Sequence, residues 1–362
     1  PDEIKEDVES ARNFDIADYN KRQVVEWILE SYYQTLDEDE RTEIQTEIQR
    51  RIQRTVVHKI SVDDGRIEYK CNGTIPGRTL NQFSMDEHSG FFRVATQTDG
   101  YWQSNVKKCT NIYVLDENLE IVGEIENIAP GENMHSARFM GNRAYLVTFK
   151  NIDPFFVIDL SDPHNPEILG ELKIPGYSDY LHPYDETHVI GIGKDSDASI
   201  DADKIHSDNA VYYTAILGVK IALFDVSDPE NPKEVSKVVI GDRGTSTPVL
   251  NDHKAFLFDR EKELLVLPIN LHELKDDNKH YADLTFQGAY VYKLNLEDGF
   301  EYQGRITHQN DDTFEDGYRW YKWPSQVTRS LYIDNVLYTI SDSMVKMNSL
   351  EDLSEINSVE LN

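Results

Sequence analysis

The pattern of apolar and polar positions changes near residue 54. Across residues 20–36, apolar side chains recur three and four positions apart, which predicts an amphipathic helix. Acidic residues from Asp37 onward indicate a new helix start. An isoleucine at every fourth position across 44–52 then predicts a second helix with a narrow apolar stripe, typical of a surface helix. Residues 1–54 are therefore predicted to form a helical hairpin or insertion.

From residue 55 the apolar period becomes two, which is the period of β-strands. Residues 57–60 and 66–69 are predicted strands, and Asp63-Asp64-Gly65 between them, with Asp-Gly at the turn, is a signal for a β-hairpin. Strand-like segments continue to the end of the chain, so residues 55–362 are predicted to be all-β.

One unit of this β pattern repeats along the chain. Its clearest copies are 156–166 and 223–232, in which an apolar strand ends in Asp and a Ser-Asp-Pro turn follows. Weaker copies lie at 113–123, 290–304 and 345–348, with upstream strands or hairpins at 91–96, 138–149, 180–190, 248–258 and 330–340. Each unit has the strands of one four-stranded antiparallel blade, and insertions fall in the loops between strands. The chain is therefore predicted to be an all-β β-propeller of about five blades.

Charge and cysteine content narrow the function. Lys and Arg number 36 against 66 Asp and Glu, a net charge of −30, so a nucleic-acid partner would be repelled. No apolar run approaches the roughly 20 residues of a membrane-spanning helix. The two cysteines, Cys71 and Cys109, are expected to form one disulfide in an oxidising compartment. Asn72 begins an Asn-Gly-Thr glycosylation sequon, which agrees with an extracellular location.

Several long segments resemble a known family. They are residues 77–87, 138–141, 156–163, 181–186 and 252–256. In these segments the chain resembles the secreted archaeal and bacterial proteins that contain a C-terminal β-propeller domain distantly related to WD-type repeats. The resemblance implies the fold and a secreted or cell-surface location, and it implies no reaction. Members of that family have further blades upstream of the helical insertion, so we expect upstream blades, in cis or from a partner chain, to complete the ring.

An acidic loop is the best candidate for a metal site. Asp195, Asp197, Asp201 and Asp203 place oxygen ligands at alternating positions, which suits Ca²⁺. The loop departs from an EF-hand, because Ile200 replaces the usual Gly and His206 the usual Glu. A solvated acidic loop is the alternative. A weaker acidic cluster occupies residues 311–316.

Histidines and aromatic residues supply the other candidates. His182, His188 and His253 lie in or beside predicted hairpin turns, where polar side chains usually stabilise the turn. If two of them converged on the central channel, a transition-metal site would be formed there. The aromatic residues Trp320, Tyr321 and Trp323 are a candidate ligand platform, and packing between blades is the alternative use.

Three functions are consistent with these patterns. The first is a non-enzymatic secreted or cell-surface module for binding or assembly, stabilised by calcium, with a protein partner or self-association. The second is a metal-dependent enzyme with its site at the central channel, although the chain has no G-x-S-x-G, P-loop or G-x-G-x-x-G motif. The third is a structural subunit of an extracellular assembly.

Overall fold

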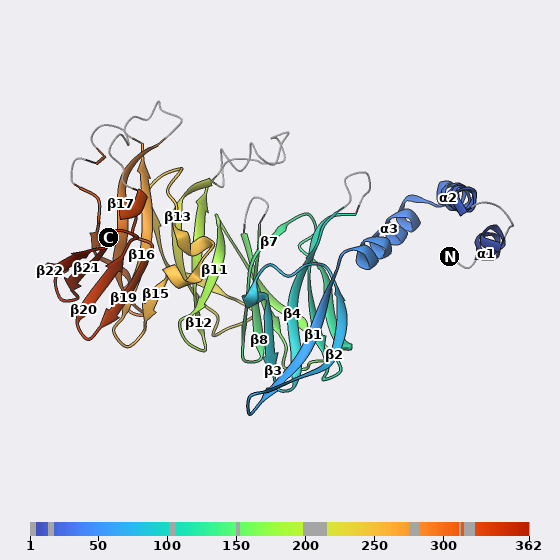
Figure 1. The fold of residues 1–362 in the computed structure, drawn as a ribbon, viewed down its shortest axis with the longest axis horizontal. Coiled ribbons are helices and arrows are strands. Elements are labelled where there is room, and N and C mark those ends of the chain that lie inside the picture. Colours follow the sequence, from blue (N-terminus) through green and yellow to red (C-terminus); the bar gives the residue numbers. More distant parts are fainter. Residues whose placement is uncertain are drawn as a thin grey trace.

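The chain begins with helices that lie beyond one end of a row of β-sheets (Figure 1). The computed structural model describes residues 5–13, 18–100, 106–149, 153–197, 216–274, 282–310, 313–314 and 323–361. The helices are α1 (Lys5–Asn13), α2 (Asp18–Thr35) and α3 (Glu38–Ile52). The sequence predicted α2 and α3 but not α1, whose nine residues are too few and too polar to show a helical period. Within the described ranges, no helix is long and apolar enough to span a membrane.

Asp37 and Glu40 explain why α3 starts where the acidic residues begin. The Glu40 amide donates to Asp37 Oδ1 at 2.9 Å, and the Asp37 amide donates to Glu40 Oε2 at 3.0 Å. This reciprocal capping box satisfies two backbone N–H groups that the first turn of a helix leaves free. The helix ends one residue before β1 begins at Arg54, with only Gln53 between them.

Five four-stranded antiparallel sheets and one two-stranded sheet make up the described β-structure. The two-stranded sheet, here called the half-blade, contains β1 (Arg54–Asp63) and β2 (Arg66–Pro76). Blade 1 contains β3 (Met85–His88), β4 (Phe91–Thr98), β5 (Cys109–Leu115) and β6 (Ile121–Ile128). Blade 2 contains β7 (Asn133–Met140), β8 (Arg143–Phe149), β9 (Asp153–Asp159) and β10 (Glu167–Ile174). Blade 3 contains β11 (Tyr177–Pro183), β12 (His188–Ser196), β13 (Ile216–Asp225) and β14 (Lys233–Ile240).

The last two sheets complete the five predicted blades. Blade 4 contains β15 (Leu257–Asp259), β16 (Leu264–Glu273), β17 (Asp283–Asn295) and β18 (Gly299–Ile306). Blade 5 contains β19 (Arg329–Ile333), β20 (Val336–Ile340), β21 (Met344–Ser349) and β22 (Glu355–Glu360). The prediction of an all-β propeller with five four-stranded antiparallel blades is therefore confirmed.

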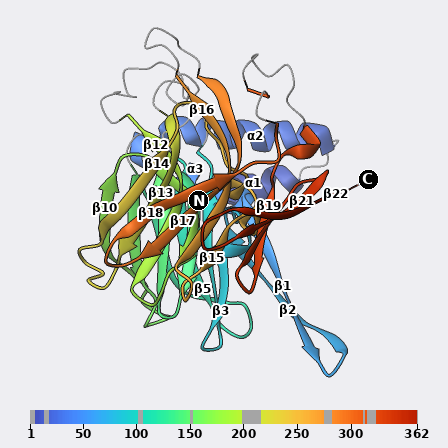
Figure 2. The same cartoon turned by 90° about the vertical axis from the view of Figure 1, so that its left-hand side faces the viewer.

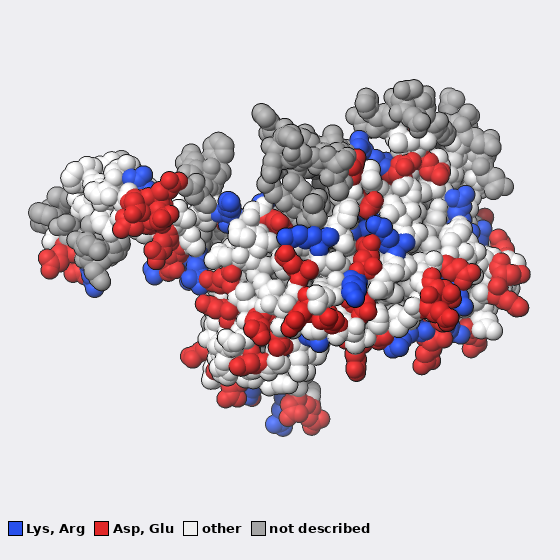
Figure 3. All heavy atoms as spheres, turned by 180° about the vertical axis from the view of Figure 1, so that it is seen from behind, with Lys and Arg blue, Asp and Glu red and all other residues white. Residues whose placement is uncertain are grey.

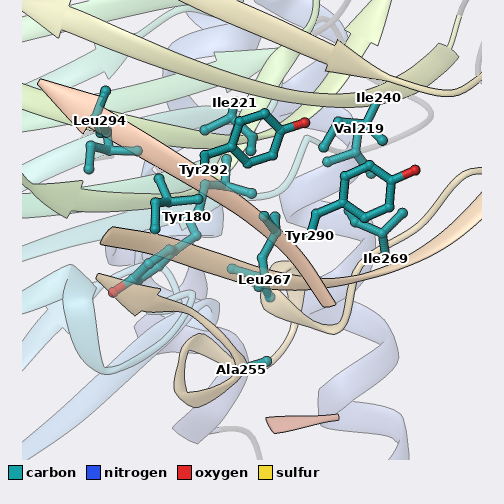
Figure 4. Packing of buried hydrophobic residues seen from close by; sticks show 14 of the residues in the cluster. Tyr180, Val219, Ile221, Ile240, Ala255, Leu267, Ile269, Tyr290, Tyr292 and Leu294 are labelled. Carbon is teal, nitrogen blue, oxygen red and sulfur yellow. The ribbon is translucent and has the colours of Figure 1, made fainter. Parts of the chain in front are cut away.

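The core lies between successive blades, because blades 1 to 4 bury both faces of their middle strands over most of their length. All seven residues of β5 are buried, and β8, β9, β12 and β13 are buried along most of their length. Figure 4 shows the core between blades 3 and 4, where Val219 and Ile221 of β13 pack against Leu267 of β16 and Tyr290 of β17. Equivalent apolar clusters join the half-blade to blade 1, blade 1 to blade 2, blade 2 to blade 3 and blade 4 to blade 5.

In blades 2 and 3, the Asp that ends the third strand stabilises the turn after it. Asp159 Oδ1 accepts the Ser161 amide at 3.0 Å, and Asp225 Oδ1 accepts the Ser227 amide at 2.9 Å. These hydrogen bonds to Ser227 also hold the pKa of Asp225 below its ordinary value. The repeated Asp therefore stabilises the turn that follows the third strand.

The same turns also fit against the outer strand of the preceding blade. A side chain at Gly123 of β6 would place its Cβ 2.2 Å from the carbonyl oxygen of Pro163. A side chain at Gly170 of β10 would place its Cβ 2.5 Å from the carbonyl oxygen of Pro229. Both distances are too short for any Cβ, so glycine is required where the outer strand meets the next turn.

The half-blade makes this contact too. A Cβ at Gly73 of β2 would lie 2.3 Å from the carbonyl oxygen of Leu119, in the turn of blade 1. Strand β2 therefore occupies the position of a fourth, outer strand, and β1 that of a third strand. The half-blade is the outer half of a blade that precedes blade 1.

One predicted hairpin, 248–258, is wrong. Its first part forms two 3₁₀ helices, η4 (Pro248–Leu250) and η5 (His253–Ala255), and the first strand of blade 4 begins only at Leu257. Pro248 fixes φ at the start of η4, and Asp252 Oδ1 accepts the Lys254 amide at the start of η5. These local bonds favour helical turns over an extended strand.

The first strands of the blades converge on a common axis. Phe83 lies in η2 (Gln82–Ser84), immediately before β3 of blade 1. Its ring is 5.5 Å from the Tyr180 ring of blade 3 and 4.9 Å from the His253 ring that precedes blade 4. The guanidinium of Arg138, from blade 2, is 4.8 Å from the centre of the same ring. One side chain thus contacts groups from three other blades.

Candidate functional site

The predicted calcium loop is only partly within the described residues. Asp195 is in β12, and Asp197 is the first residue after that strand. Asp201 and Asp203 lie outside the described ranges, as do all four acidic residues of the second cluster, Asp311, Asp312, Glu315 and Asp316. Asp195 Oδ1 is buried and has no hydrogen-bond partner among the residues that the structure describes. In the described part of the chain, no three His, Cys, Asp or Glu side chains are grouped so that they could hold a metal ion. Calcium binding by this loop therefore stays a prediction.

The predicted disulfide is wrong, and both cysteines are free. Cys109 is the first residue of β5, with its Sγ 3.0 Å from Thr98 Oγ1. Cys71 Sγ lies 3.9 Å from the carbonyl oxygen of Glu117, beyond the other end of β5. The length of β5 separates the two thiols by about 20 Å. A disulfide requires Cα atoms within about 7 Å of each other.

Two further predicted residues are on the surface. Asn72 is exposed on β2, and its amide donates to the Tyr69 hydroxyl at 2.8 Å. Trp323 is 73% exposed at the start of η6 (Trp323–Ser325), so it is not buried between blades. Trp320 and Tyr321 lie outside the described residues. Glycosylation and a ligand platform stay predictions.

The three candidate histidines lie in two places. His188 opens β12, with Nδ1 3.0 Å from Asp185 Oδ1, so it belongs to a turn as expected. The rings of His182 and His253 both lie beside Tyr180, at centroid distances of 5.9 and 6.3 Å. Two histidines therefore do meet near the axis. The described residues supply no third ligand that would complete a metal site with them.

These side chains form what we call the axial cluster: Phe83, Arg138, Tyr180, His182 and His253. Different blades supply its members, since Phe83 precedes β3, Arg138 is in β7 and His253 is in η5. The cluster combines aromatic rings with basic groups, and it contains no carboxylate. Its chemistry is therefore that of hydrogen-bond donation and ring stacking.

Burial determines the protonation state of His182. Burial, with smaller contributions from Arg138 and His253, lowers the pKa of His182 to about 4. Burial also raises the pKa of Tyr180, so the phenol keeps its proton. The Tyr180 hydroxyl and His182 Nδ1 lie 2.8 Å apart and share a hydrogen bond. Neutral His182 carries one ring proton, so one of its two ring nitrogens is a hydrogen-bond donor.

A cavity of about 300 Å³ opens beside the cluster. Its walls include Phe83, Tyr180 and His253. The amide side chains of Asn81, Gln82 and Asn251, the carboxylate of Asp179 and the apolar Val249 and Leu250 complete the lining. Asp179 Oδ1 lies 2.8 Å from His135 Nδ1, so this carboxylate already has a partner.

A second cavity, of about 310 Å³, lies between α3 and blade 1. Arg50 of α3 pairs with Glu126 of β6 at 2.5 Å across it, and the Tyr113 hydroxyl donates to the same carboxylate at 2.6 Å. Burial raises the pKa of the Cys109 thiol in this cavity. A thiol that stays protonated is a weak nucleophile, so Cys109 has the environment of a structural cysteine.

The sequence did not single out Arg138 or Phe83 as site residues. Both lie in segments that carry the family resemblance, but neither belongs to a catalytic or metal-binding motif. The sequence shows only that Arg138 lies in a predicted strand with a two-residue apolar period. That pattern does not indicate which residue of another blade the guanidinium contacts.

Comparison with known proteins identifies the family and two relatives of the chain. A family model described as "Beta propeller domain" matches residues 10–353. An uncharacterized protein of Methanocaldococcus jannaschii is 38% identical over 287 residues, which cover 79% of this chain and 37% of that protein. An uncharacterized protein of Archaeoglobus fulgidus is 32% identical over 368 residues, which cover 98% of this chain and 49% of that protein. The chain thus spans less than half the length of these relatives.

Solved structures show a more distant likeness. Apo AztD from Citrobacter koseri is 13% identical, with a TM-score of 0.44 over 82% of this chain and 63% of that one. The C-terminal WD40 domain of Sif2 is 10% identical, with a TM-score of 0.38 over 85% of this chain and 67% of that one. The family match and the five four-stranded blades show that the chain belongs to the β-propeller domain family.

Proposed function

We propose that this chain is a non-enzymatic module for binding or assembly, and that it associates through the sheets at its two ends. The observation that carries the proposal is the half-blade. In each of the other sheets, two further strands lie on the inner side of the third strand. Strand β1 occupies the third position but pairs only with β2 in the described structure. An edge strand presents free backbone N–H and C=O groups, to which another strand can add.

Apolar side chains gather on both end sheets. In the half-blade, five of them are between 49% and 76% exposed: Val56, Ile60, Val62, Ile67 and Tyr69. In blade 5, five more are between 40% and 57% exposed: Leu331, Ile333, Ile356, Val359 and Leu361. The tip of the half-blade projects beyond the other strands (Figure 2). Apolar patches of this kind are typical of interaction surfaces.

The partner that fits β1 is a pair of β-strands with apolar residues on one face. If two strands paired with the free edge of β1, they would complete a four-stranded blade. The apolar face of these strands would then pack against the exposed apolar side chains of an end sheet. Those strands belong either to the same polypeptide or to a partner chain. The relatives, which are more than twice as long as the segments they share with this chain, support the presence of further blades.

Analytical ultracentrifugation tests this proposal. We expect the isolated chain to associate as its concentration rises, because its uncovered end sheets can pair. Ile60→Glu on the half-blade should weaken this association by at least about tenfold, since it places a charge in an apolar contact. Val235→Glu is the matched control, because Val235 is 50% exposed on β14, away from both ends. A chain that stays monomeric at high concentration, or an equal effect of both variants, would contradict the proposal.

We also propose a secreted or cell-surface location and a stabilising Ca²⁺ in the acidic loop. The exposed Asn72 sequon supports the location. The buried, unpartnered Asp195 Oδ1 at the start of the loop supports cation binding. Mass spectrometry of the natively expressed protein would detect a glycan on Asn72, and an unmodified Asn72 would remove this support.

A further inference from the structure

Arg138 differs from the other arginines that stack on aromatic rings. Arg93 lies 5.5 Å from the centre of the Phe139 ring and forms an ion pair with Asp86. Arg260 also lies over a ring, at 5.1 Å, and its guanidinium is 3.4 Å from Asp185. Arg138 lies over Phe83, yet among the described residues it has neither a carboxylate within ion-pair distance nor a hydrogen-bond acceptor.

An unpaired guanidinium is unfavourable in this position. Arg138 is partly buried, and burial lowers its pKa below the ordinary value. The protein has 66 acidic residues and a net charge of −30, and Asp and Glu are spread over its surface (Figure 3). A carboxylate partner would thus be easy to provide from within the chain. A partly buried charge without a partner is the pattern of a ligand-binding group.

A second donor lies close to Arg138. The Arg138 charge contributes to the lowered pKa of His182 in blade 3, and neutral His182 carries one ring proton that it can donate. Phe256 and Phe258 flank the His182 ring at centroid distances of 5.1 and 5.5 Å. These aromatic walls reduce competition from water. They therefore strengthen any hydrogen bond that the two donors make to a charged acceptor.

We propose that the axial cluster binds an oxyanion, a carboxylate or a phosphate group, between the Arg138 guanidinium and the ring N–H of His182. The adjacent cavity of about 300 Å³ provides space for the rest of a small ligand, and its three amide side chains supply neutral hydrogen bonds. A guanidinium pairs with either oxyanion through two parallel N–H groups. The site is independent of the end sheets, so it goes beyond the assembly role proposed above.

Calorimetric titration with inorganic phosphate and with succinate, at constant ionic strength with chloride as the reference salt, tests the site. We expect saturable binding of one or both anions. Arg138→Gln should weaken anion binding at least about tenfold. His182→Phe keeps the ring packing and should also weaken anion binding. Arg305→Gln is the control, because Arg305 also stacks on a ring but donates to the Tyr290 hydroxyl. Binding of phosphate alone, or of succinate alone, identifies the chemical class of the ligand.

Two outcomes would overturn the proposal. One is the absence of saturable binding of either anion to the unmodified chain. The other is binding that Arg138→Gln leaves unchanged, since the guanidinium is the group that the site requires.

Stability without added oxyanion gives an independent test. Arg138→Met keeps the apolar stem over Phe83 and removes a partly buried charge that has no ion-pair partner among the described residues, so we expect the melting temperature to rise. Arg93→Met removes a charge that is paired with Asp86, so we expect the melting temperature to fall. If both variants lowered it equally, Arg138 would be a structural residue and the binding site would be excluded.

Discussion

Arg50 of α3 and Glu126 of β6 form an ion pair, with Nη2 and Oε1 2.5 Å apart, that ties the helical segment to blade 1. The two side chains are 35% and 20% exposed, so the pair is worth about 1 kcal/mol. We expect Arg50→Ala to speed amide hydrogen exchange across 38–52 by about fivefold and to leave exchange in the blades unchanged. The control is Arg51→Ala, because Arg51 is 78% exposed and pairs only within the helix. Equal exchange in both variants would show that α3 is held by other contacts.

The contact between Gly123 and the Pro163 carbonyl predicts a strong effect of one methyl group. Gly123→Ala would force its Cβ to within 2.2 Å of a backbone oxygen, so we expect a loss of about 3 kcal/mol in the free energy of unfolding. Gly141→Ala is the control, because Gly141 has open space around it and only its φ of 54° is unfavourable for alanine. We expect about 1 kcal/mol there. Urea denaturation measures both, and a milder effect at Gly123 than at Gly141 would contradict the packing described.

His308 predicts a specific loss of stability in acid. Its ring nitrogens lie 2.9 Å from Thr339 Oγ1 and from Ser341 Oγ, and burial lowers the pKa of His308 to about 4. The unfolded chain, with an ordinary pKa of 6.5, therefore takes up a proton that the folded chain does not. The contribution of neutral His308 is full above pH 6.5 and is lost as the pH falls toward 4, by up to about 3 kcal/mol.

Urea denaturation of His308→Gln and the unmodified chain between pH 7 and 4 measures this contribution. We expect a shallower pH dependence in the variant. His164→Gln should behave like the unmodified chain, because the His164 side chain is 66% exposed. Parallel curves for all three proteins would show that folding does not lower the pKa of His308.

Calcium removal tests the acidic loop. A ligand that binds only the folded state raises the melting temperature, so we expect added Ca²⁺ to stabilise the chain and a chelator to reverse the effect. Asp195→Asn with Asp201→Asn should abolish this shift. Asp162→Asn, in an exposed turn of blade 2, is the control. A melting temperature that does not respond to Ca²⁺ would assign the loop to solvent.

The contrast between the 156–166 unit and residues 248–258 shows what a sequence pattern can predict. In the first, a buried strand, a terminal Asp and a Ser-Asp-Pro turn are local signals that act together, and the structure forms the predicted strands there. In the second, Pro248 and Asp252 favour 3₁₀ turns, and this local preference prevails over the repeat alignment. Alignment to a repeat is therefore weakest where capping residues interrupt it.

The sequence by itself determined the blade architecture, because alternating burial and turn chemistry are local properties that recur in each unit. It also determined the start of α3, through the capping pair Asp37 and Glu40. Only the tertiary structure decided that Cys71 and Cys109 lie at opposite ends of β5, and that Arg138 stacks on Phe83 without an acidic partner. These relationships join residues from different strands or blades. They depend on how the sheets pack around the axis, which no local pattern encodes.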